Sequence, residues 1–232
     1  MLDPARGSEE EEAMNLSEAD ILWEVARVLA RDAADVSRAT GRAGAELPPL
    51  LFFTDPDRTP RPWETAARLP AGSAVVFRAF GAADARDIGR RLREATRERR
   101  GLLLVGQDAG LAEALDADGV HLPERALGTA DALAAARPDW LITGAVHSIE
   151  TLLGANAVDA AVLSPVFAAG GASAARPALG VSRFRTMARQ AAVPVYALGG
   201  ISSGNAGSLI GSGACGLAGI EGLRTAFGPI DA

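Results

Sequence analysis

The segment VPVYALGGISSGN, residues 193–205, joins a short apolar run to a pair of glycines and then to two serines. The short, continuous apolar run is typical of a buried strand. Ser202 and Ser203 are residues that favour the start of a helix. Gly199 and Gly200 stand between the two, where backbone without side chains can turn tightly and approach an anion. The segment therefore predicts one βα unit.

The same alternation recurs along the chain after Pro49. Fully apolar strands that alternate with helices indicate parallel βαβ units, and eight units favour a closed (β/α)8 TIM barrel over an open sheet. The turn at residues 54–58 has no glycine, which counts against a dinucleotide-binding sheet. The expected strands are 50–54, 74–78, 102–105, 119–122, 140–144, 160–164, 193–198 and 214–218, and the expected helices include 83–99, 148–156, 182–189, 203–211 and 221–226.

Two parts of the chain differ in composition. Residues 47–232 carry the βα pattern and are slightly fewer than the roughly 200 residues at the low end for such barrels, which predicts a compact barrel with short loops. Residues 1–46 form an N-terminal extension, with an acidic tail at 1–15 that we expect to be disordered. An amphipathic helix is predicted from about 18 to 40. We expect it to cover the bottom of the barrel or to bind a partner.

The composition excludes several chemistries. All 23 cationic residues are arginine, so Schiff-base lysines, lysine bases and P-loop lysines are absent. The net charge of −6 gives no reason to expect nucleic-acid binding. A single cysteine, Cys215, rules out an internal disulfide, and its place in an apolar strand predicts an inert core residue.

The chain shows no sign of membrane targeting. Its N-terminus is polar and acidic, unlike a signal peptide, and no apolar run reaches the roughly 18 residues of a membrane span. We therefore expect a cytoplasmic protein that binds small molecules, with a homo-oligomer as one expected state.

In a barrel of this kind the active site lies where the strands end. Arg78 ends the second strand, so we expect its cation at the barrel mouth. His147 follows the fifth strand and is either a general acid–base or a hydrogen-bonding residue of the rim.

Two glycine-rich turns are candidates for binding a phosphate. Gly199 and Gly200 follow strand seven, and Gly219 and Ile220 follow strand eight, where phosphate commonly binds in these barrels. The alternative is that these glycines only permit tight turns.

Other polar residues at strand ends favour structural roles. Asp55 and Asp57 either hold a metal or form a common turn. His121 lies partly within a strand and is expected to be structural. Glu124 and Arg125 are expected to form a solvated pair on the rim.

Five motifs occur together in order and spacing. They are ADGVHL (117–122), AVHS (145–148), SPVF followed by PALG (164–180), VPVYALGGIS (193–202) and GSGACGLAGI (211–220). With them the chain resembles the thiamine phosphate synthases and the related thiazole tautomerases (TenI-like proteins) over about residues 50–223. The resemblance implies a TIM barrel that binds a phosphorylated thiazole or pyrimidine. In the synthases, hydroxymethylpyrimidine pyrophosphate is joined to thiazole phosphate, and Mg2+ stabilises the pyrophosphate that leaves. In the tautomerases, a proton is shifted on a thiazole carboxylate phosphate, and a histidine is implicated in that shift.

Much of the synthase pattern is absent. Arg78 matches the arginine of the Gln-x-Arg-x-Lys motif, but Phe80 and Ala172 stand where the family has lysines. Gly106 and Gln107 replace the Asn-Asp pair whose aspartate binds magnesium, and residues 123–126 replace Gly-Gln-x-Asp. No metal-binding residue is therefore assigned, and Mg2+ is expected only if synthase activity is retained.

Three functions are compatible with this pattern. The first is a divergent synthase, and the second is a tautomerase that uses His147 and one phosphate site. The third is a non-catalytic regulatory module that binds a phosphorylated ligand. We expect an enzyme.

Overall fold

The fold was determined as a computed structural model, which describes residues 16–39, 47–171 and 174–229. The acidic tail at 1–15 and Ala172 lie outside the described residues. Among the described helices, none combines the length and the apolarity that crossing a membrane requires.

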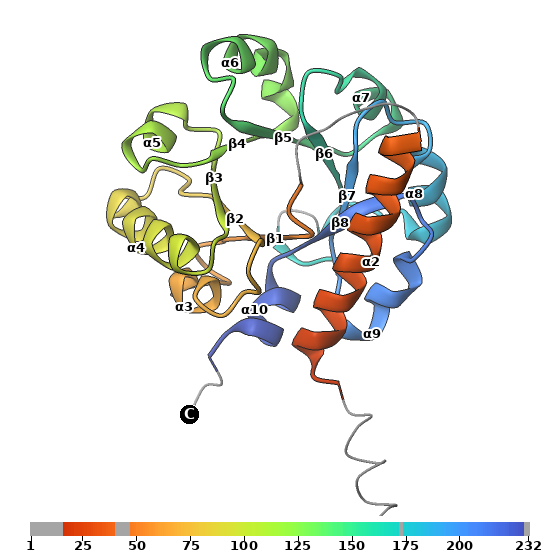
Figure 1. The fold of residues 1–232 in the computed structure, drawn as a ribbon, viewed down its shortest axis with the longest axis horizontal. Helices are drawn as coiled ribbons and strands as arrows, with labels where there is room; N and C mark the ends of the chain where they lie inside the picture. Colours follow the sequence, from red (N-terminus) through yellow and green to blue (C-terminus); the bar gives the residue numbers. More distant parts are fainter. Residues whose placement is uncertain (1–15, 40–46, 172–173, 230–232) are drawn as a thin grey trace, which may run out of the picture.

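Eight parallel strands close into a barrel in sequence order, with β8 pairing back onto β1. Figure 1 shows the strands surrounded by the helices. Each predicted strand is present, with ends that differ by at most two residues, so the TIM barrel is confirmed. The strands are β1 (Leu50–Phe53), β2 (Ala74–Phe77), β3 (Leu102–Gly106), β4 (Gly119–Leu122), β5 (Leu141–Val146), β6 (Ala160–Leu163), β7 (Val195–Leu198) and β8 (Ala214–Gly219).

The helices are mostly short, as expected for a compact barrel. The sequence analysis did not predict α3, α5 or the helical segment after β4, because the apolar spacing in these segments is weak. The helix expected at 203–211 is divided into an α-helix and a 3-10 turn. The described elements are α2 (Glu18–Ala39), α3 (Pro62–Ala66), α4 (Ala85–Glu98), α5 (Ala109–Ala114), η1 (Glu124–Thr129), α6 (Ala130–Ala136), α7 (Ile149–Gly154), α8 (Gly180–Ala188), α9 (Ser203–Ala206), η3 (Gly207–Leu209) and α10 (Glu221–Phe227).

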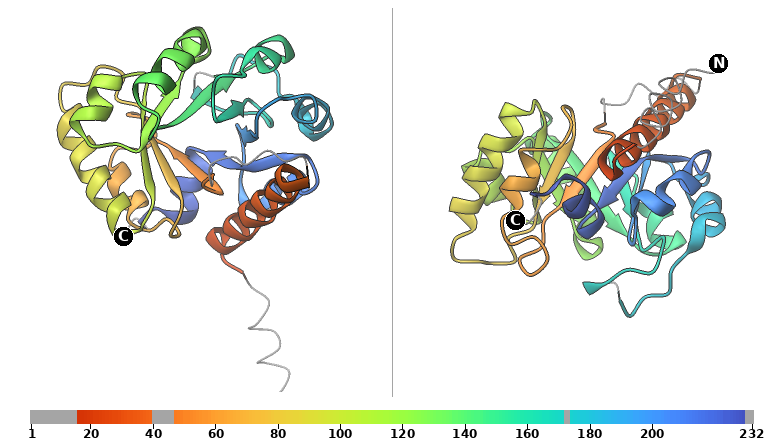
Figure 2. Two further views of the ribbon diagram at one scale, coloured as in Figure 1. Left: turned by 45° about the horizontal axis from the view of Figure 1, so that its top comes forward. Right: turned by 90° about the horizontal axis from the view of Figure 1, so that it is seen from below.

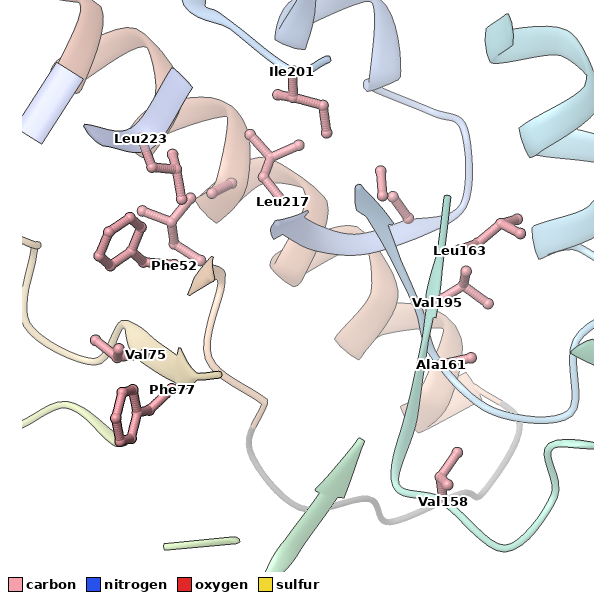
Figure 3. Close-up of a cluster of buried hydrophobic side chains, with 14 of the residues drawn as sticks. Phe52, Val75, Phe77, Val158, Ala161, Leu163, Val195, Ile201, Leu217 and Leu223 are labelled. Carbon is pink, nitrogen blue, oxygen red and sulfur yellow. The ribbon is translucent and has the colours of Figure 1, made fainter. Parts of the chain in front are cut away.

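The strands separate two apolar layers because alternate side chains point to opposite faces. Leu51 and Phe53 belong to the cluster inside the barrel, whereas Phe52 belongs to the layer beneath the helices. Figure 3 shows the outer layer around Phe52 and Leu217. Cys215 is buried in the inner cluster and burial raises the pKa of its thiol, which confirms it as an inert core residue.

The N-terminal helix α2 is part of the outer layer. It lies against β8, with α9 and α10 as neighbours, as Figures 1 and 2 show. Leu22 and Leu29 are buried in the same cluster as Leu217. The sequence left two expectations for this helix, a cover for the bottom of the barrel or a surface that binds a partner. Most of its apolar stripe instead packs on the outer wall of the barrel. Of its described side chains, Ala33 also packs against the interior cluster. The reason is that its buried side chains Leu22 and Leu29 find apolar partners, Leu217 of β8 among them, in the layer outside the strands.

This packing makes the extension important for stability. Leu22→Ala is expected to lower the free energy of unfolding by about 2–5 kcal/mol, because Leu22 is fully buried and a cavity would remain. Leu16→Ala is the matched control, since Leu16 is 59% exposed, and should change stability by no more than about 0.5 kcal/mol. Urea denaturation measures both. Equal values for the two variants would contradict the packing of α2 on the barrel.

Candidate functional site

A cavity of about 850 Å³ opens where the strands end, and it is lined by residues at or just after the carboxyl end of every strand. Because all eight strands are parallel, their carboxyl ends meet at one face of the barrel. The structure brings the six residues proposed from the sequence together around this cavity. They are Arg78, His147, Gly199, Gly200, Gly219 and Ile220.

The glycine pair after β7 lies against the segment that follows β6. Gly199 and Gly200 have φ values of +105° and +64°, and a Cβ on Gly200 would lie 2.3 Å from the carbonyl oxygen of Ala168. The N–H of Phe167 donates to the carbonyl oxygen of Gly199 at 3.0 Å. Tight packing thus accounts for both glycines.

The same turn leaves backbone donors at the cavity. Among the described residues, none accepts a hydrogen bond from the N–H of Gly200 or Ile201, and both residues line the cavity. Asn205 donates from its side chain to the carbonyl oxygen of Gly200 at 2.7 Å and so fixes the peptide. The packing explanation and the phosphate-binding explanation are therefore compatible.

Arg78 is held at the end of β2 by neighbouring polar and aromatic groups. Its Nε–H donates to the carbonyl oxygen of Thr54 at 2.7 Å, and Nη2 lies 3.2 Å from Oδ2 of Asp55. Its guanidinium carbon lies 5.7 Å from the ring centre of Phe53 and 5.2 Å from that of Phe80. Burial lowers the pKa of Arg78 to about 10, which leaves it cationic at neutral pH.

Asp55 forms a turn and two ion pairs. Its Oδ1 accepts hydrogen bonds from the N–H groups of Asp57 and Arg58, both at 3.2 Å, and Oδ2 lies 2.9 Å from Nη2 of Arg58. Burial alone would raise the pKa of Asp55, but the hydrogen bonds and charge of Arg58, with the charge of Arg78, lower it below the usual value. The turn interpretation of Asp55 is confirmed.

His147 follows β5 with both ring nitrogens facing polar groups. Its Nδ1–H donates to the carbonyl oxygen of Ser164 at 3.0 Å, because a carbonyl oxygen can only accept. This leaves Nε2, which lies 3.8 Å from Oε2 of Glu124. Thr151 donates its hydroxyl to Oε1 of the same carboxylate. Glu124 therefore backs the imidazole that lines the cavity.

The expected rim pair of Glu124 and Arg125 is wrong. Glu124 interacts with His147 and Thr151, while Nη2 of Arg125 donates to Oε1 of Gln107 at 2.5 Å. The physical reason is that adjacent residues at the start of η1 point in different directions. Sequence reasoning missed Glu124 as a site residue, although β4 and β5 are neighbours in the predicted order and their ends must lie close together.

His121 is a buried part of the cavity wall. Its Nδ1 lies 3.0 Å from the hydroxyl of Thr143, and its ring meets that of Phe53 edge-on at 4.9 Å. Burial, with smaller contributions from Arg78 and His147, lowers the pKa of His121 to about 3. The structural role expected for His121 is therefore supported, and the ring is neutral near pH 7.

This neutral ring makes stability depend on pH. The pKa of a histidine rises to about 6.5 on unfolding, so the unfolded chain binds an extra proton between the two values. The contribution of the neutral ring to the free energy of unfolding should be fully present above about pH 6.5. It should fall as the pH drops below that value, by at most about 1.4 kcal/mol per pH unit. His121→Asn should remove this dependence between pH 7 and 5 in urea denaturation. An unchanged slope in the variant would assign the dependence to other groups.

Comparison with known proteins identifies the family of this chain. The family model described as "Thiamine monophosphate synthase" matches residues 51–223. The chain belongs to this family. A thiamine-phosphate synthase of Chlorobium luteolum is 32% identical over 191 residues, which are 80% of this chain and 89% of that protein. One of Methanoculleus marisnigri is 33% identical over 129 residues, which are 55% of this chain and 61% of that protein.

A solved structure supports the same family and fold. The thiamine phosphate pyrophosphorylase from Pyrococcus furiosus is 28% identical, with a TM-score of 0.65, and the match covers 77% of this chain and 91% of that one. The chain is thus a synthase-like protein of thiamine biosynthesis, from a family of transferase-like enzymes.

The residues at the mouth do not fit the magnesium ion that the family implies. Within the described ranges, no group of three or more histidine, cysteine or acidic residues could hold a metal ion. Gly106 and Gln107 occupy the Asn-Asp positions, and the nearby carboxylate of Asp108 accepts the N–H of Leu111 as the N-cap of α5.

Proposed function

We propose that this chain binds a phosphorylated thiazole in the cavity and transfers a proton on it, with His147 as the acid–base group. The observation that carries the proposal is the arrangement of His147: its ring lines the cavity, its Nδ1 is fixed by Ser164, and its Nε2 stands 3.8 Å from Oε2 of Glu124. This reaction needs neither a metal ion nor a lysine, which agrees with the residues at the mouth.

The geometry suggests a role for each group. The lone pair on Nε2 accepts a proton from one position of the thiazole, and the same nitrogen returns it at another position. No other group leaves or is added. While the ring carries the extra proton, the carboxylate of Glu124 stabilises its positive charge, and the carbonyl of Ser164 holds the ring in place.

The phosphate is assigned to the turns after β7 and β8. The N–H groups of Gly200 and Ile201 are available at the cavity, and Gly219 and Ile220 line it from the adjacent strand. Backbone donors bind an anion without a cationic side chain. The position agrees with the usual phosphate site of TIM barrels.

A magnesium-dependent condensation is the second candidate, because the relatives carry the name thiamine-phosphate synthase. A third candidate is a non-catalytic module that binds the phosphorylated thiazole. The replacement of the family's Asn-Asp pair by Gly106 and Gln107 argues against the second. The described arrangement of His147 argues against the third, because a ligand-binding module has no use for a fixed acid–base pair.

One assay separates the candidates. The purified chain is incubated with the thiazole carboxylate phosphate tautomer in EDTA, and the two tautomers are followed by proton NMR. We expect conversion in EDTA and no thiamine phosphate when hydroxymethylpyrimidine pyrophosphate and MgCl2 are added instead. Condensation without tautomerisation would support the synthase, and binding of thiazole phosphate in calorimetry without either reaction would support the module.

A further inference from the structure

Glu124 carries a flexible side chain that is 32% exposed. It begins η1, and among the contacts that the structure describes its carboxylate has no partner within that segment. A glutamate of this kind can adopt several rotamers, and holding it in one of them costs conformational entropy. Its place beside His147 therefore requires a contact from another part of the chain.

Thr151 of α7 provides that contact. Its hydroxyl donates to Oε1 of Glu124, and Oε2 of the same carboxylate lies 3.8 Å from Nε2 of His147. Glu124 follows β4 and Thr151 follows β5, and these strands are neighbours in the barrel. One oxygen of the carboxylate is thus held by α7, and the other faces the imidazole.

The direction of each hydrogen bond follows from the atoms involved. An ionised carboxylate only accepts, so the single hydroxyl proton of Thr151 goes to Glu124. Oγ of Ser148 lies 3.1 Å from Oγ1 of Thr151, and Ser148 is therefore the donor in this contact. Ser148 also caps α7, because its Oγ accepts the N–H of Thr151 at 3.1 Å. The hydroxyl that holds Glu124 is thus fixed to the start of the helix.

The distance between Oε2 of Glu124 and Nε2 of His147 suits a group that transfers a proton. At 3.8 Å it is longer than a hydrogen bond of about 2.7–3.2 Å, so the lone pair on Nε2 stays available to a ligand. It is still short enough for the carboxylate to stabilise the ring once the ring is protonated. A carboxylate turned toward solvent would lose most of that attraction, because water and salt screen charges. The orientation of Glu124 therefore decides its effect on His147.

We infer that Thr151 is a positioning residue, which holds Glu124 in the conformation that faces Nε2 of His147. Thr151 and Glu124 lie outside the residues that line the cavity, so Thr151 acts through Glu124 and His147 and not on a ligand. The effect of this contact on the reaction rate rests on the proposed function. The resemblance to synthases implies a glutamine at the position of Glu124, so the charged pair is a feature of this chain.

Two substitutions at Thr151 separate its hydroxyl from its methyl group. Thr151→Val keeps the shape of the side chain and removes the donor, so kcat for tautomerisation should fall about tenfold, the usual effect of losing a hydrogen bond to a charged group. KM should change by less than about twofold, because no ligand contact is removed. Thr151→Ser keeps the hydroxyl and should retain kcat within about threefold. The rates are measured by proton NMR.

Thr186→Val is the matched control. Thr186 lies in α8 outside the cavity lining, and its hydroxyl donates to the carbonyl oxygen of Ser182 at 3.1 Å. The substitution makes the same chemical change in another helix, so kcat should stay within about twofold. An equal loss of rate in this variant would assign the effect at Thr151 to general destabilisation and overturn the inference.

A double-mutant cycle distinguishes positioning from a purely structural role. Glu124→Gln removes the charge that Thr151 positions, so it should lower kcat at least as much as Thr151→Val does. Adding Thr151→Val to Glu124→Gln should then lower kcat by no more than about twofold further, because the effects of coupled residues do not add. Losses that multiply in the double variant would contradict the inference, since Thr151 would then act independently of Glu124.

Crystal structures of the unchanged chain and of Thr151→Val give a readout without turnover. Oε2 of Glu124 should lie beside Nε2 of His147 in the first structure and point away from it in the second. If Glu124 keeps its place in the Thr151→Val structure, the inference is wrong whatever the rates are. If the unchanged chain converts no thiazole, the proposed function fails, while the two structures still decide whether Thr151 holds Glu124.

Discussion

Replacement of His147 by alanine is expected to lower kcat for thiazole tautomerisation by about 10²- to 10⁴-fold, the usual contribution of a positioned acid–base group. The Kd for the phosphorylated thiazole should stay within a few-fold, because the phosphate is assigned to backbone donors after β7 and β8. The rate is measured by proton NMR, and the Kd by calorimetry. A loss of rate with retained binding identifies a residue that acts on the reaction.

Ser164→Ala provides the control for this variant. It removes the hydroxyl that lies 3.2 Å from Nδ1 of His147, but the carbonyl oxygen at 3.0 Å remains. The rate should therefore change by no more than a few-fold. Full tautomerase activity in His147→Ala would refute the proposed role.

The second large effect is expected at Gly200. In Gly200→Ala, the new Cβ would lie 2.3 Å from the carbonyl oxygen of Ala168, in backbone with a φ of +64° that side chains disfavour. The segment after β6 or the glycine turn must move, which takes the N–H groups of Gly200 and Ile201 away from the phosphate, and losing a hydrogen bond to a charged group costs roughly 10- to 100-fold in affinity. Calorimetry should show this loss in the affinity for thiazole phosphate.

Gly207→Ala is the matched substitution in the same region. A Cβ on Gly207 meets no atom within 4 Å, and its φ of −57° suits any residue. Its affinity should equal that of the unchanged chain. If both variants bound thiazole phosphate normally, the phosphate site would have to lie elsewhere in the cavity.

Most of the fold could be predicted because its signals are local. Each apolar run of four to six residues specifies a buried strand whatever its partners, and strands β1 to β8 appear where the sequence expects them. Gly199 and Arg78 follow strands, so the barrel rule alone places them at one mouth. The short helices α3 and α5 were missed, because five or six residues show too little periodicity.

The sequence by itself determined the parallel barrel, the face that holds the site and the loss of the family's magnesium carboxylates, since these depend on residue order and type. Only the tertiary structure decided which charges meet. Asp55 pairs with Arg58 inside its own turn but also meets Arg78 at the end of the next strand, and Glu124 faces His147 instead of its neighbour Arg125. The physical reason is that ion pairs form between strand ends brought together by barrel closure, and their partners are selected by distance and side-chain direction, which no linear spacing encodes.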